Sequence, residues 1–330
     1  MEDRIKNVCI TGGAGYVGAI LVPKLLNDGY HVTVIDLMIY GKDLLQPHPN
    51  LRIIEGDIRD QDLLKSTIAG HQAVIHLACI SNDPSFELNP ELGKSINLDA
   101  FRPLVEICRD NYVKRFIYAS TGAVYGVKGE PHVYEEMELE PLTDYARFKA
   151  DCESILFEYQ SENFTTVAIR SATVCGYSPR QRLDVVVNIL TNLAYHKREI
   201  TVFGGEQLRP NIHIDDVARL YSTLLKIQKE KIAGEVFNIC NENYSVKDLA
   251  NIVKTIIGDD VNLVTSPTDD IRSYHLSAKK IKNSLGFKCE KTIEDAVSDL
   301  RDAFRQGSLP DSLNSDLYFN VKRMQNISLE

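Results

Sequence analysis

The sequence contains no run of 18 apolar residues and no excess of positive charge. Its 330 residues include 37 lysines and arginines against 46 aspartates and glutamates, a formal net charge of −9 at pH 7. The missing apolar run excludes a transmembrane helix. The acidic balance argues against a nucleic-acid or membrane partner, although it leaves room for a local cationic pocket that binds phosphates. Residues 1–6 lead into a strand pattern and do not resemble a signal peptide.

Paired cysteine motifs are also absent. The seven cysteines are scattered, odd in number and never spaced as Cys-x-x-Cys, which argues against a zinc site and a disulfide framework. We therefore expect reduced thiols, a cytoplasmic protein and no metal site. The chain shows no internal repeat, and its 44% apolar and 25% charged residues are ordinary for a globular protein of one or two domains.

The stretch from Val8 to Gly18 organises the chain. A short apolar run is followed by glycines at 12, 15 and 18 and then by a helical apolar pattern. This order suits a dinucleotide diphosphate, because glycines permit a tight turn and a close approach, and a helix N-terminus attracts an anion. The residues predicted to contact the cofactor in this turn are Gly12, Gly15, Tyr16, Val17 and Gly18.

A second strand pattern, His31 to Asp36, ends in an acid 18 residues after Gly18. A carboxylate at that place accepts hydrogen bonds from the adenosine ribose and repels a 2′-phosphate, which predicts NAD rather than NADP. The alternative is a glycine-rich turn without a ligand. The combination of strand, glycines, helix and acid favours the cofactor site.

Further strand patterns lie at 51–58, 73–78 and 115–120, and a helical pattern covers 95–110. The alternation of strands and helices predicts an α/β fold, a Rossmann-type doubly wound parallel sheet that binds its ligand at the C-terminal ends of the strands.

Several residues near these strand ends are candidates for the cofactor site. Ala78 is small enough to let the cofactor lie against the backbone. Asp57 is either an acceptor for the adenine amino group or an ordinary turn acid, and His76 is better explained as a structural residue. The remaining predicted cofactor contacts in this part are Ile58, Leu77 and Asn97.

Proton chemistry is predicted at three residues. Thr121 directly follows the strand pattern 115–120, and Tyr145 and Lys149 lie four residues apart in a helical pattern, so they share a face. A phenol is a weak base at neutral pH because its reference pKa is near 10, but a neighbouring ammonium group favours the phenolate. A Tyr-x3-Lys pair can equally lie on a solvated helix face. Its place after a dinucleotide turn favours catalysis.

Taken together, these segments resemble the extended short-chain dehydrogenase/reductases, in the branch of NAD-dependent sugar-nucleotide epimerases and dehydratases. The matching segments follow family order over positions 8 to 287: Thr11-Gly12-Gly13-Ala14-Gly15-Tyr16-Val17-Gly18, Gly56-Asp57-Ile58, His76-Leu77-Ala78, Thr121-Gly122-Ala123-Val124-Tyr125-Gly126, Tyr145-x3-Lys149, Arg209 to Ala218, and Leu285-Gly286-Phe287. The resemblance implies that Tyr145 is the acid/base, that Lys149 is its partner and a ribose ligand, and that Thr121 donates to the substrate.

Departures from the family pattern narrow the reaction. Dehydratases of this branch carry Asp-Glu after the catalytic threonine, whereas this chain has Gly122 and Ala123. The 4-epimerases of the branch have a pair of small residues there, which agrees with this chain. In contrast, Thr173 stands where the family usually has asparagine, and the loop from Ser81 to Pro84 differs from that of common 4-epimerases. Ser81, Asp83 and Thr173 are therefore the predicted sugar contacts, and the identity of the sugar stays open.

The second half of the chain is interpreted as a smaller, interleaved α/β substrate-binding lobe. The predicted division places 1–174 and the returning segment 212–240 in the cofactor domain, and 175–211 with 241–330 in the substrate lobe. A helix is expected over 215–226, capped by aspartate. Arginine suits a diphosphate because its fork donates two hydrogen bonds; Arg209 is the stronger candidate by resemblance, and Arg272 is either a second one or a solvated loop charge.

These observations predict an NAD-dependent nucleotide-sugar oxidoreductase acting at C4, most simply a 4-epimerase. The alternatives are a net 4-dehydrogenase, including one acting on a nucleotide-linked heptose, a 4-ketoreductase, or a non-catalytic NAD-binding regulator on the same fold. The resemblance also implies that helices near 95–110 and 144–159 pair across a two-fold axis into a homodimer, although their apolar residues can equally pack on the sheet. The segment 305–330 carries no motif and is expected to pack on the surface.

Overall fold

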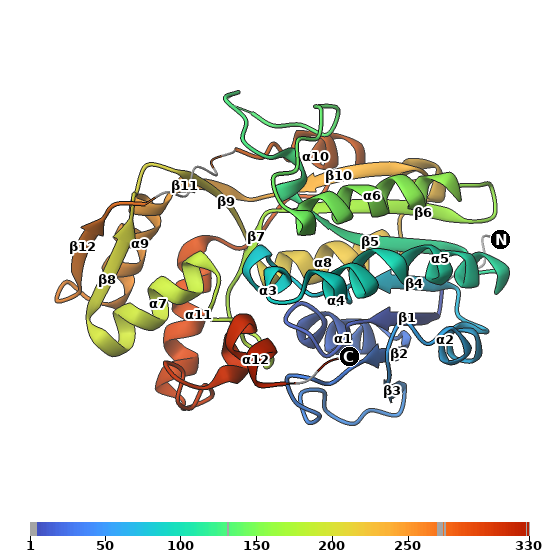
Figure 1. The fold of residues 1–330 in the computed structure, drawn as a ribbon, viewed down its shortest axis with the longest axis horizontal. Helices are drawn as coiled ribbons and strands as arrows, with labels where there is room; N and C mark the ends of the chain where they lie inside the picture. The colour runs from blue at the N-terminus through green and yellow to red at the C-terminus, as the bar shows by residue number, and fades with distance from the viewer. Residues whose placement is uncertain (1–4, 131, 269–272, 274, 328, 330) are drawn as a thin grey trace.

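The computed structural model describes residues 5–130, 132–268, 273, 275–327 and 329. It contains a seven-stranded parallel sheet with the strand order β10-β6-β5-β4-β1-β2-β3 (Figure 1). The bounds of its strands are β1 Asn7–Thr11, β2 His31–Asp36, β3 Leu51–Glu55, β4 Ala73–His76, β5 Arg115–Thr121, β6 Thr165–Ser171 and β10 Glu235–Ile239. The order reverses beside β1, so a crevice opens at the carboxyl ends of β1 and β4, as the Rossmann-type prediction requires.

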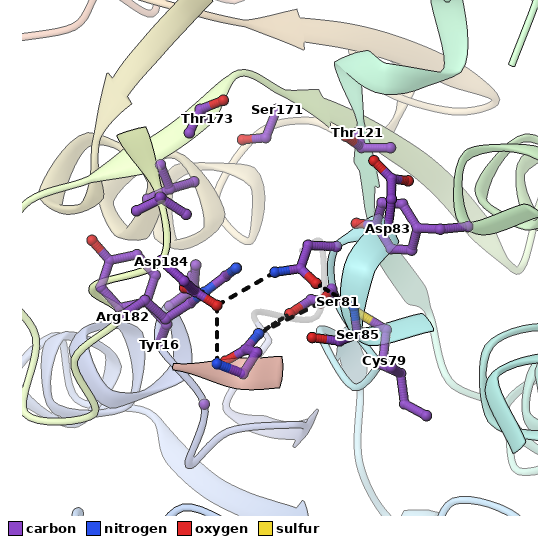
Figure 2. A pocket seen from close by; sticks show the side chains of 18 of the residues that line it. Tyr16, Cys79, Ser81, Asp83, Ser85, Thr121, Ser171, Thr173, Arg182 and Asp184 are labelled. Atoms are coloured by element: carbon purple, nitrogen blue, oxygen red, sulfur yellow. Dashed lines mark hydrogen bonds and ion pairs between the residues drawn. The ribbon is translucent and has the colours of Figure 1, made fainter. Parts of the chain in front are cut away.

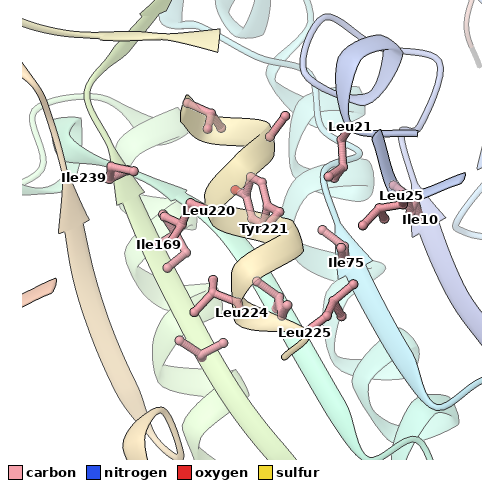
Figure 3. Close-up of a cluster of buried hydrophobic side chains, with 14 of the residues drawn as sticks. Ile10, Leu21, Leu25, Ile75, Ile169, Leu220, Tyr221, Leu224, Leu225 and Ile239 are labelled. Carbon is pink, nitrogen blue, oxygen red and sulfur yellow. The ribbon is translucent and has the colours of Figure 1, made fainter. Parts of the chain in front are cut away.

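Helices cover both faces of this sheet because its inner strands are apolar on both sides. One face packs against α1 (Gly18–Asn27) and α8 (Ile214–Leu224), and Figure 3 shows Leu220, Tyr221 and Leu224 of α8 lying over the strands. The opposite face packs against three helices: α2 Gln61–Ile68, α5 Phe101–Asp110 and α6 Asp144–Glu158.

Several element boundaries differ from the sequence-based predictions: β4 ends at His76 instead of position 78, β5 continues to Thr121, and α8 ends at Leu224 instead of position 226. Two further differences have a visible cause. β3 ends at Glu55 instead of continuing to position 58, because Asp57 Oδ1 accepts the Arg59 N–H at 2.8 Å and turns the chain. α8 begins one residue earlier than predicted, and its cap is His213, whose Nδ1 accepts the Asp215 N–H at 3.1 Å, instead of an aspartate.

The predicted single helix over 95–110 is also wrong. The structure has a π-helical turn, Ser95–Asp99, followed by α5. Pro103 lies in the first turn of α5 and has no N–H to donate to the carbonyl of Asp99, so the regular hydrogen-bond ladder cannot continue through this point.

A second group of elements lies beside the large sheet (Figure 1). It contains a three-stranded sheet of order β11-β9-β7 and a two-stranded sheet of β12 and β8. The strand bounds are β7 Thr173–Cys175, β8 Glu199–Phe203, β9 Leu208–His213, β11 Glu242–Ser245 and β12 Asn262–Ser266. Helices α7 (Val186–Lys197), α9 (Val246–Ile257) and α11 (Ile293–Arg305) share a separate apolar core there.

The described residues also contain four short α-helices, α3 Asp83–Glu87, α4 Pro90–Lys94, α10 Lys279–Leu285 and α12 Asn320–Asn326, and three 3-10 turns, Gly122–Tyr125, Lys229–Lys231 and Asp316–Tyr318. α12 returns to the first half of the chain, where Met324 and Leu329 pack near Ile58 and Ile80. None of the helices in the described ranges is long and apolar enough to cross a bilayer.

Candidate active site

A cavity of about 720 Å³ runs along the carboxyl ends of the central strands into the second group of elements. Figure 2 shows Tyr16, Arg182 and Asp184 on one side of it and Cys79, Ser81 and Asp83 on the other. Most of the predicted site residues line this one cavity: Gly12, Gly15, Tyr16, Val17, Gly18, Asp36, Ile58, Leu77, Ala78, Ser81, Asp83, Thr121, Tyr145, Lys149, Thr173 and Arg209.

The glycine turn has the close packing that a dinucleotide site needs. Gly12 has φ +74°, and a Cβ at this position would lie 2.5 Å from the backbone nitrogen of Ala78. A Cβ on Gly18 would collide with the carbonyl oxygen of Gly13, where α1 starts against the turn. The N-terminus of α1 has no side-chain cap, so it presents its positive end to the cavity.

Asp36 is held against this turn. Its Oδ2 accepts the Ala14 N–H and its Oδ1 accepts the Met38 N–H, both at 2.9 Å. Burial raises the pKa of the Asp36 carboxyl, and the two N–H groups oppose that effect. The carboxylate thus faces the cavity beside the turn, in the position predicted for a ribose ligand.

The three residues predicted for proton chemistry come from two adjacent elements. Thr121 ends β5, and its Oγ1 accepts the Ala123 N–H at 3.2 Å. Tyr145 lies in the first turn of α6, and the buried Lys149 donates from Nζ to the Ala119 carbonyl at 2.7 Å. Lys149 Nζ lies 6.0 Å from the centre of the Tyr145 ring, which places an ammonium group near the phenol.

His76 is structural, as the sequence indicated. Its Nδ1 lies 2.6 Å from Thr11 Oγ1, and its ring packs among Phe101 and Tyr118. Burial, followed by the charge of Lys149, lowers the pKa of His76 to about 3. The imidazole is therefore neutral at physiological pH, and it does not line the cavity.

Two predicted cofactor residues lie behind the cavity wall. Asn97 is buried, with its side chain bonded to the backbone N–H and carbonyl of Ile80 at 2.8 and 2.9 Å. Asp57 receives hydrogen bonds from the Arg59 guanidinium, the shortest at 2.7 Å. Neither residue lines the cavity. In this structure Asn97 holds the backbone of Ile80 and Asp57 stabilises a turn, and their direct contact with the cofactor stays a prediction.

The other predicted substrate residues that the structure describes come from three separate parts of the chain and line the same cavity. Ser81 and Asp83 follow β4, and Asp83 Oδ1 accepts a hydrogen bond from Thr143 Oγ1 at 2.6 Å. Thr173 begins β7, and Arg209 lies on β9. Arg272 lies outside the described residues.

Sequence reasoning missed a polar cluster across the cavity. Arg182 Nε donates to Asp184 Oδ1 at 2.9 Å, and Asp184 Oδ2 accepts the backbone N–H of Asn320 at 3.0 Å. Asn320 Nδ2 in turn donates to Ser81 Oγ at 2.9 Å. The one signal for it was the run Pro179-Arg180-Gln181-Arg182-Leu183-Asp184, which carries three charges in five residues directly before a helix.

This cluster corrects the prediction for the C-terminal segment. Instead of packing on the outer surface alone, the segment places Asn320, Met324 and Leu329 in the wall of the cavity. It is further anchored by Arg323, which donates from Nε to the Ile39 carbonyl and pairs with Asp316.

The model of the NAD-dependent epimerase/dehydratase family matches residues 8–240, which spans the glycine turn, the three residues predicted for proton chemistry and β9. The chain belongs to this family. NAD is the family's cofactor, and its enzymes act on nucleotide sugars. The chemistry of the glycine turn, of Asp36 and of the uncapped start of α1 fits that cofactor.

Individual relatives differ in activity. A dTDP-glucose 4,6-dehydratase from Streptomyces niveus is 27% identical over 322 residues, covering 90% of this chain and 92% of the relative. The structure of UDP-glucose 4-epimerase from Thermotoga maritima with UDP-glucose has a TM-score of 0.83 at 28% identity and covers 91% of this chain and 99% of its own. UDP-glucose 4-epimerase from Thermus thermophilus with NAD has a TM-score of 0.80 at 26% identity, with coverage of 91% and 99%.

Proposed function

We propose that this protein is an NAD-dependent nucleotide-sugar 4-epimerase. The observation that carries the proposal is the pair that follows Thr121 at the reaction end of the cavity. Gly122 and Ala123 have no group that can move a proton, whereas loss of water from a sugar requires a second acid and base beside the tyrosine. The site therefore supports oxidation and reduction at one carbon, without elimination.

The roles of the side chains follow from their positions. NAD, when bound, supplies the hydride acceptor and donor. Tyr145 takes the proton from the C4 hydroxyl during oxidation and returns it during reduction, with the ammonium of Lys149 favouring the phenolate. Thr121 holds the sugar oxygen at the end of β5. The 4-keto sugar then turns over in the cavity and is reduced on its other face.

Arg209 anchors the diphosphate of the substrate in this proposal. It lines the part of the cavity formed by β8 and β9, away from Asp36 and the glycine turn. Exposed Phe203, at 57% relative accessibility, lines the same part and offers a ring face to the nucleobase. The substrate class is a nucleoside diphosphate sugar.

A net 4-dehydrogenase is the second candidate, favoured by two unusual sugar-end positions. Thr173 and Asp83 both line the cavity, and a site that rejected the turned keto sugar would stop after oxidation. The heptose and ketoreductase alternatives would use the same residues.

A product assay separates these reactions. The chain would be incubated with NAD and a panel of nucleotide sugars, with NMR of the sugar and absorbance of NADH recorded together. A 4-epimerase converts one sugar into its C4 epimer without net NADH. Stoichiometric NADH with a keto sugar would establish the dehydrogenase instead. A 4-keto-6-deoxy product would contradict the inference that a site with Gly122 and Ala123 cannot eliminate water.

We also propose that the protein is a homodimer through the outer surfaces of α5 and α6. Leu104 and Leu156 are buried in the core of the single chain and are not available to a partner. The outer surface instead carries the Arg102–Glu158 ion pair. A monomeric mass by light scattering at micromolar concentration would contradict the dimer.

A further inference from the structure

Arg180 is a buried cation whose hydrogen-bonding capacity is only partly used. It lies in the loop between β7 and α7, is 4% exposed, and lines the cavity. Its Nη2 donates to Asn320 Oδ1 at 2.6 Å, whereas Nε and Nη1 have no hydrogen-bond partner among the described residues. A buried guanidinium with unpaired donors is costly unless an anion meets it.

The surroundings of Arg180 place it at the cofactor end of the cavity. Its Cζ lies 3.4 Å from the centre of the Tyr40 ring, four residues after Asp36. The same loop is bonded to the glycine turn twice, because Ser178 Oγ donates to the Tyr16 carbonyl at 2.8 Å and the Tyr16 hydroxyl donates to the Gly176 carbonyl at 2.7 Å.

The charge of Arg180 persists in this environment. Burial lowers its pKa to about 10, with Tyr40 acting in the opposite direction, so the guanidinium stays protonated at neutral pH. The acid Asp184 pairs with Arg182 and is not within ion-pair distance of Arg180. Burial raises the pKa of the Asp36 carboxyl and the charge of Arg180 opposes that rise, so this cation lies near both the Asp36 carboxylate and the glycine turn.

We propose that the Arg180 guanidinium, which lines the cavity beside the glycine turn, binds the diphosphate of NAD. The planar fork of arginine matches two phosphate oxygens. Arg180 belongs to a loop of the second half of the chain, so this contact ties that half to a cofactor held by the first. The inference depends on the family's cofactor and not on which net reaction follows.

Asn320 acts here as a positioning residue. It contacts the Arg180 guanidinium and also bonds to Ser81 and Asp184. The C-terminal segment thereby fixes the direction in which Nε and Nη1 point.

The test is calorimetric titration of the full-length chain with NAD, ADP and UDP. R180Q should lower the affinity for NAD and for ADP at least tenfold and leave the affinity for UDP within twofold of the wild type. The affinities of R180K should lie between those of R180Q and the wild type, because lysine keeps the charge without the planar fork. R219Q is the matched control, since Arg219 also stacks on an aromatic ring, at 4.2 Å from Phe287, and does not line the cavity. If R180Q does not fold, R180K decides alone through the same contrast between ADP and UDP.

Three results would overturn the assignment. Unchanged NAD and ADP affinity would show that no phosphate meets Arg180. A loss confined to UDP would move the residue to the substrate diphosphate, and an equal loss of all three ligands would make it a structural support of the whole cavity. Because binding is measured without turnover, each result is independent of whether the enzyme is a 4-epimerase.

A second variant tests Asn320. N320A should lower the affinity for ADP when Arg180 is present but have no further effect in R180Q, because no guanidinium remains to be positioned. An additive loss in the double variant would contradict the positioning role.

Discussion

The two ends of the cavity differ in how the chain builds them. Most of the cofactor end comes from one continuous segment, in which β1, the glycine turn, α1 and β2 bring Gly12 and Asp36 together, and the loop that carries Arg180 joins it from the second half of the chain. The opposite side joins Ser81 to Asn320 across 239 residues. The comparison teaches that a site made of one supersecondary unit can be recognised by its spacing, whereas a site made by docking distant segments depends on the complete fold.

The largest expected effect is at the shared boundary of the two ends. Tyr145→Phe keeps the ring and removes only the hydroxyl, so turnover on an accepted nucleotide sugar should fall by about 10²–10⁴-fold, while NAD binding stays near that of the wild type. Tyr112→Phe is the matched control, because Tyr112 is 88% exposed and far from the cavity lining. Steady-state kinetics that stay near wild type in Tyr145→Phe would assign the proton to another group, with Asp83 as the next candidate.

The same chemistry predicts a pH effect at Lys149. Lys149→Ala should lower turnover and shift the rise of the pH–rate profile to higher pH, because the phenolate loses its neighbouring positive charge. A profile of unchanged position, measured over the stable pH range, would separate Lys149 from the proton transfer.

Asp36 tests whether the cofactor end works independently of the substrate end. Asp36→Ala should lower the affinity for NAD and reduce the ratio of NAD to NADP affinity by about tenfold or more, since hydrogen bonds to a charged group typically contribute about 1.5–3 kcal/mol. Asp36→Asn separates charge from shape, and Asp43→Ala is an exposed control. The affinity for a nucleotide sugar should not change, and a wild type that prefers NADP would contradict the assignment of β2.

Arg209 is the corresponding test of the substrate end. Arg209→Ala should weaken UDP or GDP binding by more than about tenfold, because a charge-assisted hydrogen bond contributes about 1.5–3 kcal/mol, with NAD affinity nearly intact. Arg198→Ala, an exposed arginine paired with Asp260, is the control. If nucleotide affinity measured by calorimetry stays unchanged, Arg209 is a surface charge and does not bind the substrate diphosphate.

A smaller effect concerns the stability of the cofactor end. The folded-state pKa of His76 is about 3 against an ordinary value of 6.5, so below pH 6.5 the unfolded chain takes up a proton that the folded chain refuses. The histidine therefore costs about 2 kcal/mol of stability between pH 6.5 and 5. Urea unfolding of His76→Asn should show a correspondingly weaker loss over this range than the wild type. Parallel pH dependences of the two proteins would contradict the buried neutral imidazole.

Much of the first half of the fold could be predicted because its signals are local. The strand ends, the glycine turn and the i, i+4 spacing of Tyr145 and Lys149 are fixed by near neighbours in the sequence. The break at Ser95–Asp99 was missed although Pro103 was visible, because the apolar period continues through a π turn.

The polar cluster and the C-terminal wall could not be predicted in the same way. Arg180 and Asp184 lie in one short run, but Asn320 comes 136 residues after Asp184, and no spacing relates it to that run. Their contact depends on how α11 and the segment after it return to the first half of the chain. Asn97 shows the converse case, since its sequence position suggested a ligand contact and the fold uses its amide on Ile80.

The most direct test of the central claim follows the hydrogen at C4. A nucleotide sugar that the enzyme accepts would be deuterated at C4 and incubated with the full-length protein and unlabelled NAD, and the label would be located by NMR in the sugar and in the nicotinamide pool. The account predicts that the C4 epimer forms with the deuterium retained at C4 and none in free NADH. Deuterium in released NADH, or a C4 epimer that has lost its label to water, would contradict a 4-epimerase that works by hydride transfer and return within one site.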